Sequence, residues 1–222
     1  MSERLADAEI EQAITAATVG RSHVLDLRAL NVWGFSYEAF RCLVNNLCHA
    51  KQPVVYLEVG VFCGATLAAA MSGNEGTFIG VDDFSFAAAV PMVPEDFRDR
   101  PQEFCRGSVE WVMRTFGRGK GRFLEVACEA MDVRTLPQVD VFLFDGDHSL
   151  EGTARGFAHF VPCLAPDAIV IVDDYGAESV CAGVGRAMEE TGLRLEAPFA
   201  TVGPRWATCV FVAQRESGGQ DA

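Results

Sequence analysis

The segment from which the architecture follows is VVYLEVGVFCGAT, residues 54–66. Residues 54–59 are apolar except for Glu58, a pattern typical of a strand that is buried on both faces of a parallel sheet. Gly60 and Gly64 follow and allow a tight turn whose backbone can approach a ligand closely. The next segment has helical length, and the N-terminus of a helix offers unpaired backbone N–H groups. The segment therefore predicts a strand, a ligand-facing turn and a helix in succession.

The same alternation continues along the chain. Short apolar runs predict strands at 77–81, 122–127, 139–144 and 168–172, and helical periodicity lies at 150–163 and near 179–191. Two last runs, 193–199 and 206–213, flank a turn-like Val202-Gly203-Pro204 and are expected to pair antiparallel. The expected fold is α/β: a Rossmann-like, doubly wound sheet of seven strands, mostly parallel with an antiparallel last hairpin, and with helices on both faces.

The N-terminal residues stand apart from this pattern. Residues 1–50 contain two expected helices, one over 3–19 and one with Ser36 as its N-cap. We expect residues 1–50 to be a helical lead-in that helps to cover the substrate. Residues 51–214 are the expected ligand-binding domain, and the polar residues 215–222 are an expected flexible tail.

The composition excludes several classes of partner. The chain has 222 residues with 31 acidic and 18 basic side chains, a formal net charge of −13, and half of its residues are hydrophobic. This charge makes nucleic acid and an anionic membrane surface poor partners and favours a small-molecule substrate. The eight cysteines are scattered without a zinc-type spacing, and residues 1–7 lack a signal-peptide pattern. We expect a cytoplasmic protein with buried, reduced thiols and no membrane span.

Acidic residues mark the ends of the first two expected strands. Glu58 precedes Gly60 by two residues, where a carboxylate repels a pyrophosphate and attracts an amino group. The glycine spacing also differs from the G-x-G-x-x-G dinucleotide fingerprint. Asp82 ends the second strand, the usual place for an acid that binds the ribose hydroxyls of an adenosine cofactor. An isolated Asp at a strand end is also a common turn residue, so Asp82 alone decides little.

Three motifs taken together resemble a known family. E-x-G-x-x-x-G-x-T at 58–66, followed by a strand that ends in Asp, resembles the class I S-adenosylmethionine-dependent methyltransferases. DGDHSLEG at 145–152 and LAPDAIVIVDDY at 164–175 narrow the resemblance to methyltransferase family 24, which is similar to metal-dependent small-molecule O-methyltransferases. The chain departs from the family pattern at Leu150, often Tyr, and at Asp167-Ala168, which replaces Gly-Gly in an expected turn.

The resemblance implies roles for individual residues. Asp82 would bind the ribose of S-adenosylmethionine, and Asp145 would serve both the cofactor and a cation. Three converging carboxylates repel one another unless a cation neutralises them, and all-oxygen ligation favours Mg²⁺ among the divalent ions. The sequence is silent on the oligomeric state, and a homo-oligomer is possible because related enzymes commonly associate. The implied cofactor-binding residues are Glu58, Gly60, Gly64, Thr66, Asp82, Cys128, Glu129 and Asp145, and the implied metal ligands are Asp145, Asp173 and Asp174.

His148 is the candidate general base. It follows two strand-end acids, and an imidazole can take a hydroxyl proton near neutral pH. Asp145, or metal activation alone, is the rival to His148 in this role, whereas Asp147 is more simply a turn residue. Trp33-Gly34-Phe35 and the irregular segment 84–101 are expected to cover the substrate.

The expected activity is methyl transfer from S-adenosylmethionine to a hydroxyl of a sugar, a catechol or a natural-product core, assisted by a divalent cation. Three alternatives remain open. One is a metal-independent methyltransferase in which His148 alone acts as the base. The others are a nicotinamide-dependent oxidoreductase, which the glycine spacing disfavours, and a non-catalytic scaffold.

Overall fold

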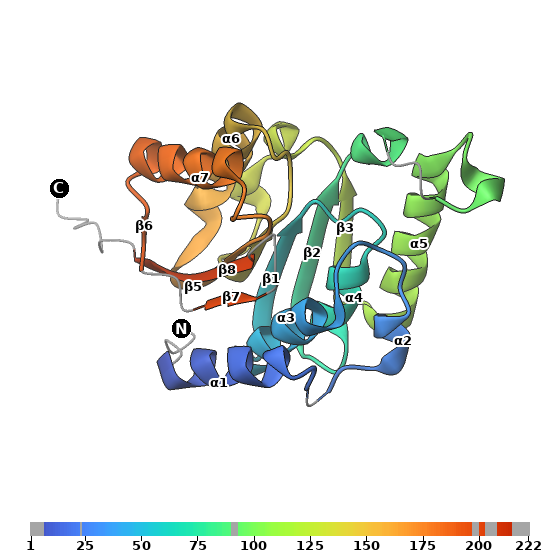
Figure 1. Ribbon diagram of the computed structural model, residues 1–222, viewed down its shortest axis with the longest axis horizontal. Coiled ribbons are helices and arrows are strands. Elements are labelled where there is room, and N and C mark those ends of the chain that lie inside the picture. The colour runs from blue at the N-terminus through green and yellow to red at the C-terminus, as the bar shows by residue number, and fades with distance from the viewer. Residues whose placement is uncertain (1–6, 23, 90–92, 197–199, 203–207, 215–222) are drawn as a thin grey trace.

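The computed structural model describes residues 7–22, 24–89, 93–196, 200–202 and 208–214 (Figure 1). The expected tail at 215–222 and the first residues of the expected helix at 3–19 lie outside these residues. The helices are α1 (Asp7–Thr18), α2 (Leu27–Leu30), α3 (Glu38–Ala50), α4 (Ala65–Met71), α5 (Pro101–Phe116), α6 (Leu150–Phe160) and α7 (Glu178–Thr191). The strands are β1 (Val54–Val59), β2 (Gly76–Asp82), β3 (Gly121–Glu125), β4 (Val139–Phe144), β5 (Leu164–Val172), β6 (Arg194–Leu195), β7 (Ala200–Val202) and β8 (Thr208–Gln214).

One sheet carries these strands in the order β3-β2-β1-β4-β5-β8, with the short β6 and β7 paired to β8. The first five strands run parallel and β8 is antiparallel to β5. The strand order reverses between β1 and β4, so the loops that follow these two strands diverge. In doubly wound sheets the ligand crevice lies at this switch point, outside the carboxyl ends of the strands. The Rossmann-like sheet expected from the sequence is therefore confirmed.

Two predicted strands differ in detail. β5 begins at Leu164 rather than at 168, with a register shift against β4 between Val139 and Val141. Asp167 therefore lies within a strand, not in the expected turn, and its Oδ2 accepts a hydrogen bond from Lys51 Nζ at 2.9 Å. The expected strand at 193–199 is represented by β6 at its start, and β7 follows it. Both short strands lie along the edge of β8 opposite β5.

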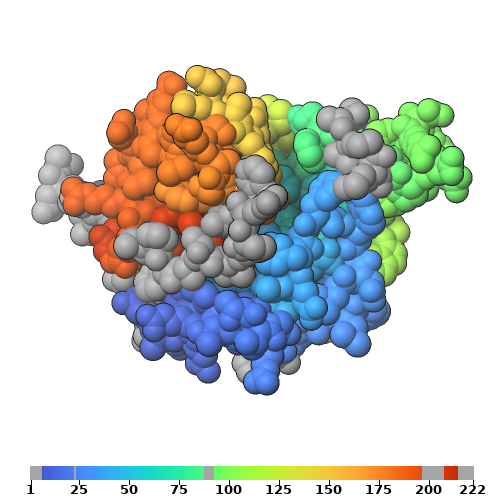
Figure 2. Space-filling model, in the orientation of Figure 1, coloured from blue at the N-terminus to red at the C-terminus, as the bar shows by residue number. Residues whose placement is uncertain are grey.

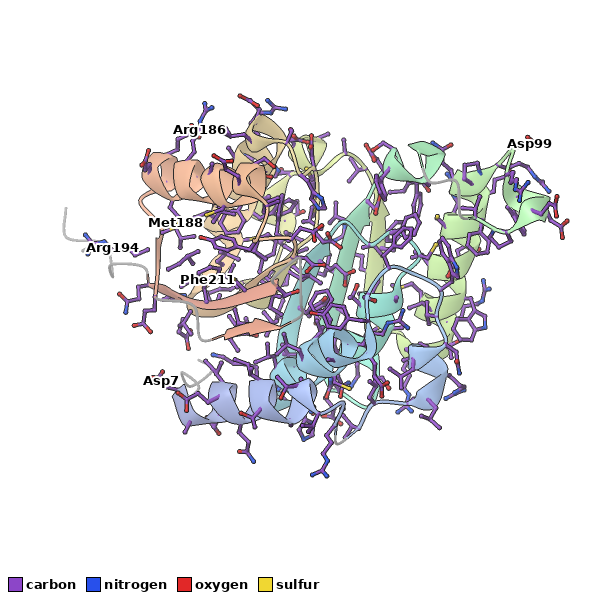
Figure 3. The ribbon with its side chains drawn as sticks, viewed as in Figure 1. Asp7, Asp99, Arg186, Met188, Arg194 and Phe211 are labelled. Atoms are coloured by element: carbon purple, nitrogen blue, oxygen red, sulfur yellow. The ribbon has the colours of Figure 1, made fainter. Side chains whose placement is uncertain are left out.

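Alternate residues of each strand enter two separate cores, one on each face. Tyr56 and Val141 face a core built with α1 to α5, whereas Leu57 and Phe142 face a core built with α6 and α7. Figure 1 shows these two helical layers on opposite sides of the sheet. Figure 3 illustrates the second layer, where Met188 of α7 lies toward the sheet strand that carries Phe211, and Arg186 points outward.

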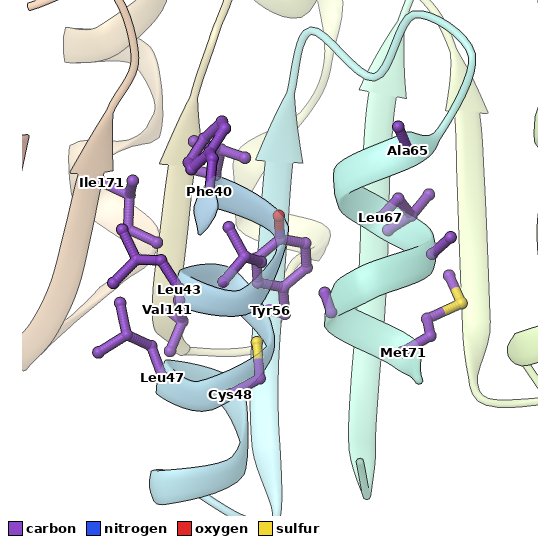
Figure 4. Close-up of a cluster of buried hydrophobic side chains, with 14 of the residues drawn as sticks. Phe40, Leu43, Leu47, Cys48, Tyr56, Ala65, Leu67, Met71, Val141 and Ile171 are labelled. Carbon is purple, nitrogen blue, oxygen red and sulfur yellow. The ribbon is translucent and has the colours of Figure 1, made fainter. Parts of the chain in front are cut away.

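The lead-in packs directly on the sheet. Phe40, Leu43 and Leu47 of α3 are almost fully buried against β1 and β4 (Figure 4). α1 lies outside α3 and contributes Ile10 and Ile14 to the same core. The space-filling view shows α1, in dark blue, forming the lower edge of this face (Figure 2). The lead-in is thus part of the central core and not a separate lobe.

Two smaller expectations can be compared with the structure. α3 begins at Glu38 after Tyr37, so Ser36 is not its N-cap; the Ser36 hydroxyl instead accepts a hydrogen bond from Arg41 Nε at 2.9 Å. All eight cysteines lie in the described part of the chain and are free thiols; six are buried, but Cys128 is partly buried and Cys181 is exposed, so the expectation of buried thiols is wrong for these two. Among the described residues, no helix is long and apolar enough to cross a membrane.

Candidate active site

The glycine turn after β1 touches the end of β4. Gly60 and Gly64 have φ angles of 89° and 83°, which L-residues with a Cβ rarely adopt. A Cβ on Gly60 would lie 1.8 Å from the carbonyl oxygen of Asp145. The Asp145 N–H also donates to the Val59 carbonyl at 2.9 Å. The expected cofactor turn and the first expected metal ligand are therefore coupled through the backbone.

Glu58 lies beneath this turn and is fully buried. Its Oε2 accepts a hydrogen bond from the Tyr56 hydroxyl at 2.7 Å, and its Oε1 accepts one from the Thr66 hydroxyl at 2.5 Å. Burial raises the pKa of Glu58 to about 8, even though both hydroxyl donors oppose the shift. The structure thus places Glu58 and Thr66 together. Tyr56, whose hydroxyl completes this set, was not predicted because a buried strand residue gives no signal in the sequence.

Replacing Glu58 by glutamine is expected to stabilise the ligand-free protein at alkaline pH. The folded-state pKa of about 8 exceeds the ordinary glutamate value of 4.5, so the folded protein keeps a proton that the unfolded chain releases. The stabilisation that protonated Glu58 contributes is therefore complete below about pH 4.5 and is lost as pH rises through about 8. Thermal melts from pH 5 to 9 should show a flatter pH dependence for Glu58→Gln and a Tm gain on the order of 5 °C at pH 9.

The exposed Glu189→Gln is the matched control, because Glu189 lies on the solvent side of α7. It should leave both the Tm and its pH dependence unchanged. A Glu58→Gln protein that melts below wild type at pH 9 would show that the ionised carboxylate stabilises the fold.

Asp82 anchors the loops on either side of it. Its Oδ2 accepts a hydrogen bond from the Phe62 N–H and its Oδ1 accepts one from the Phe84 N–H, both at 2.6 Å. Phe62 and Phe84 have φ angles of 50° and 56°, so Asp82 holds two residues in the left-handed region. Asp82 is half-buried, and desolvation raises its pKa. Each carboxylate oxygen retains a further lone pair with which it can accept from a ligand hydroxyl.

Cys128 and Glu129 follow β3, the strand that pairs with β2. The Cys128 thiol donates to Glu129 Oε2 at 3.0 Å, and Arg155 Nε lies 3.8 Å from Glu129 Oε1. Burial raises the pKa of Cys128 to about 12, so the thiol is neutral. This short helical turn occupies the same edge of the sheet as Asp82, and its role toward a cofactor remains a prediction.

Three acid–base side chains meet at the ends of β4 and β5. His148 Nε2 lies 3.3 Å from Asp145 Oδ1, and His148 Nδ1 lies 3.3 Å from Asp174 Oδ2. One ligand atom of each of the three residues lies within 4.8 Å of the others, a grouping that could hold a metal ion. Asp174 reaches this position with a φ of 52°. We refer to Asp145, His148 and Asp174 as the acid–imidazole cluster.

Asp173 faces a different neighbour. Its Oδ1 accepts a hydrogen bond from the Thr208 hydroxyl of β8 at 2.5 Å, and Thr208 is also hydrogen-bonded to the phenol of Tyr37. The structure therefore brings together Asp145 and Asp174, with His148 between them, while Asp173 binds the adjacent strand. Thr208 and Tyr37 were not predicted as part of the site. Thr208 lies 35 residues beyond Asp173, and Tyr37 lies before β1, so only the folded chain brings them to this site.

Burial and the hydrogen bond between Asp145 and His148 dominate the electrostatics of the cluster. Burial raises the pKa of Asp145 to about 7, and Asp173 and Asp174 add to this effect. Hydrogen bonding to Asp145 raises the pKa of His148 above its ordinary value, against the opposing effect of its own burial. The site therefore has excess negative potential, which the imidazole offsets in part and which a bound cation would offset further.

Asp147 shapes the turn between Asp145 and α6, as the sequence favours. Its Oδ1 accepts a hydrogen bond from the Ser149 N–H at 2.8 Å, and its carbonyl accepts one from the Thr153 hydroxyl at 2.7 Å. Ser149 then caps α6 by accepting from the Gly152 N–H at 3.0 Å. These bonds fix where His148 projects from the turn.

An aromatic cluster from the expected cover segments lies against the glycine turn. Phe35 stacks on Phe62 with centroids 5.3 Å apart, and Trp33 lies 5.4 Å from Phe62. Phe86 also contacts Phe62, edge to face, with the ring centroids 5.9 Å apart. Phe35 and Phe86 are 52% and 61% exposed, so the cluster presents aromatic faces to solvent beside the turn. Trp33 and the segment after β2 thus meet at Phe62, which the sequence did not identify as their partner.

The sheet order, the glycine turn at the switch point and the strand-end acids define a Rossmann-like methyltransferase of class I, the S-adenosylmethionine-dependent class. Solved structures of this class are similar to the chain. Podospora anserina methyltransferase PaMTH1, bound to S-adenosylhomocysteine, has a TM-score of 0.59, 12% identity, and covers 98% of this chain and 100% of its own. A Bacillus cereus O-methyltransferase in complex with S-adenosylhomocysteine has a TM-score of 0.54 and 13% identity, with 94% and 91% covered. CalS11, a TDP-rhamnose 3'-O-methyltransferase of calicheamicin biosynthesis, has a TM-score of 0.55 and 17% identity, with 92% and 93% covered.

The sequence comparison completes the assignment. Residues 57–175, more than half of the chain, match the methyltransferase domain of family 24, and the protein belongs to that family. No curated protein sequence matches the chain. The family match covers the glycine turn, Asp82 and the acid–imidazole cluster together. It favours a methyltransferase over the nicotinamide-dependent oxidoreductase.

Proposed function

We propose that this methyltransferase transfers a methyl group to a hydroxyl oxygen of a small molecule and that a divalent cation assists at the acid–imidazole cluster. One observation carries the proposal. Asp145, His148 and Asp174 converge within 4.8 Å at the ends of β4 and β5, and the backbone of Asp145 contacts the glycine turn. A proton acceptor and cation ligands thus lie next to the expected methyl donor.

The residues around the glycine turn suit S-adenosylmethionine. The positive φ angles of Gly60 and Gly64 turn the backbone without a Cβ on the ligand side, and the N-terminus of α4 follows directly. Glu58 would bind the amino group of the methionine part; it keeps its proton below a pKa of about 8 in the ligand-free protein, and a cationic amino group beside it would favour the carboxylate form. Asp82 would bind the ribose, because its two oxygens keep acceptor capacity after accepting from the Phe62 and Phe84 N–H groups. Cys128 and Glu129 would border the adenine.

The cluster also suits a hard divalent cation. Asp145 and Asp174 offer carboxylate oxygens, the ligands that Mg²⁺ prefers, which leaves His148 to act as the proton acceptor. Asp173 lies beside them and would add a ligand if its side chain turned from Thr208. The pKa of Asp145 is raised mainly by burial and further by Asp173 and Asp174, so a bound cation would favour its ionised form.

The chain's own residues would manage the acceptor proton. When bound, S-adenosylmethionine supplies a methyl group on a sulfonium, and a divalent cation supplies charge that favours an ionised acceptor oxygen. A neutral His148 can donate to only one of Asp145 and Asp174, so its second ring nitrogen is free to take a proton. The resulting imidazolium would be stabilised by both carboxylates. Phe35 and Phe86 would exclude water from one side of the acceptor.

A second candidate is a metal-independent methyltransferase with His148 as the sole base. The position of His148 between the two carboxylates favours it, because a protonated imidazole already offsets part of their charge. The two candidates share the cofactor site and differ only in whether activity requires a cation.

Calorimetry and a methyl-transfer screen test the proposal. The protein should bind S-adenosylhomocysteine, and Asp82→Ala should weaken this binding at least about tenfold, the loss expected for charged hydrogen bonds. The exposed Asp83→Ala is the matched control and should bind as wild type does. Absence of binding by the wild-type protein would refute the cofactor site.

The screen should offer catechols, sugars and hydroxylated natural-product cores, with Mg²⁺ and after exhaustive chelation. Methyl transfer that requires the cation supports the proposal. Full activity after chelation would remove the cation from the reaction and leave the second candidate.

A further inference from the structure

Two buried thiols meet directly behind the glycine turn. Cys63 lies between Phe62 and Gly64, and Cys105 lies on the first half of α5. Their sulfurs are 3.3 Å apart, and the two residues are 1% and 0% exposed. The Ser108 hydroxyl, one turn along α5, donates to the Cys63 carbonyl at 2.7 Å. The turn is therefore held against α5 through both the side chain and the backbone of Cys63.

The separation of the sulfurs is short enough for covalent closure. A disulfide bond is about 2.05 Å long, so the two sulfurs would approach by about 1.3 Å from their 3.3 Å contact. The Cys63 thiol donates to Cys105, and this hydrogen bond lowers the pKa of Cys105. Cys105 is thus the sulfur that more readily becomes a thiolate, the form that reacts with oxidants.

We propose that Cys63 and Cys105 form a modification site in which a hydroperoxide converts the two thiols into a disulfide that joins the glycine turn to α5. The Cys105 thiolate attacks the terminal peroxide oxygen and breaks the O–O bond, which gives a sulfenic acid and releases hydroxide or an alkoxide that is protonated to water or an alcohol. The Cys63 sulfur then attacks the sulfenic sulfur, forms the S–S bond and releases hydroxide. That hydroxide takes the Cys63 thiol proton and leaves as water. The two thiols lose two electrons and the peroxide gains them.

The disulfide would change the cofactor site because Cys63 belongs to the turn itself. Closing the sulfurs draws the turn toward α5 and shifts the backbone between Gly60 and Gly64, whereas Asp82 continues to hold the Phe62 N–H. Displacements of this size near a binding site weaken ligand binding appreciably. Linkage then requires that a bound cofactor opposes disulfide formation by the same factor. This second consequence depends on the proposed cofactor site, whereas the cross-link itself does not.

Mass spectrometry tests the cross-link without reference to activity. Reduced protein is treated with hydrogen peroxide, and its remaining thiols are alkylated in denaturant. The expected product is lighter by about 2 Da before alkylation and yields one linked pair of peptides that contain Cys63 and Cys105. Its Tm should rise by about 5 °C or more, because the bond closes a long loop. If Cys63 and Cys105 are both alkylated after the exposed Cys181 has been oxidised, the modification site is refuted.

Binding of S-adenosylhomocysteine tests the effect on the turn. The oxidised protein should bind about tenfold more weakly than the reduced protein, and dithiothreitol should restore the affinity. Cys105→Ser should bind as reduced wild type does and should not respond to peroxide, whereas Cys181→Ser should respond as wild type does. A cross-linked protein with unchanged affinity would refute the effect on the cofactor site. If even the reduced protein does not bind, the proposed function fails while the mass measurement still decides the cross-link.

Discussion

Replacing Asp145 by asparagine is expected to lower kcat for methyl transfer by about 100- to 1,000-fold, the usual cost of removing one electrostatic group from a reacting centre. Asparagine keeps the shape of the side chain and the backbone contact with Gly60. It removes the negative charge that faces His148 and that would hold a cation. Binding of S-adenosylhomocysteine should weaken by less than about tenfold, because the glycine turn and Asp82 are unchanged. Steady-state kinetics together with calorimetry separate the two effects.

Asp147→Asn is the matched control for this experiment. Asp147 lies two residues away, is exposed and accepts the Ser149 N–H, a bond that asparagine can also accept. Its kcat should remain within about threefold of wild type. A loss of kcat as large as that of Asp145→Asn would indicate that Asp147 also takes part in the reaction. An Asp145→Asn protein with normal kcat would exclude the acid–imidazole cluster from the reaction.

Replacing Gly60 by alanine should impair both stability and cofactor binding. The new Cβ would lie 1.8 Å from the Asp145 carbonyl oxygen, so the turn or the end of β4 must move. The φ of 89° adds backbone strain. We expect a loss of about 3 kcal/mol or more in the free energy of unfolding and a fall of about 100-fold in affinity for S-adenosylhomocysteine. Denaturant unfolding and calorimetry measure these quantities.

Two other glycines separate the causes of this effect. Gly64 has a similar φ, 83°, but the nearest atoms to a Cβ there are side-chain carbons, of Val112 at 3.3 Å and Val109 at 3.5 Å. Gly64→Ala should therefore cost only the strain, about 1–2 kcal/mol. Gly107 lies within α5, and a Cβ there meets nothing within 4 Å, so Gly107→Ala should stabilise by about 0.5–1 kcal/mol. Equal losses for Gly60→Ala and Gly64→Ala would show that the contact with Asp145 is unimportant.

The central strands could be predicted because their burial is continuous. Val54–Val59 and Val139–Phe144 occupy the interior of the sheet, where an uninterrupted apolar run marks a strand. Asp167 was misread because a charged residue before an apolar run suggests a turn. In the structure the partner of Asp167 is Lys51, 116 residues away and almost fully buried. A long-range ion pair of this kind leaves no local pattern in the sequence.

The candidate site, like the fold, could be predicted only in part. The strand-end positions of Glu58, Asp82 and Asp145 follow from topology, because parallel strands end at one edge of the sheet. The direction in which each side chain points does not follow from topology. Asp173 and Asp174 are neighbours in sequence, yet one binds Thr208 and the other faces His148. The φ of 52° at Asp174 separates their directions, and a backbone angle of this kind is decided by the surrounding fold.

The contribution of α1 and α3 to the central core bears on how acceptor preference can change. Leu43 and Leu47 bury the face of the sheet that includes Tyr56 and Val141, and Tyr56 in turn donates to Glu58. Exchange of residues 1–50 with those of a relative would therefore alter the packing beneath the glycine turn as well as the aromatic cover. New acceptor preferences should arise more readily by single substitutions at exposed positions such as Phe35 and Phe86 than by recombination of the whole N-terminal segment.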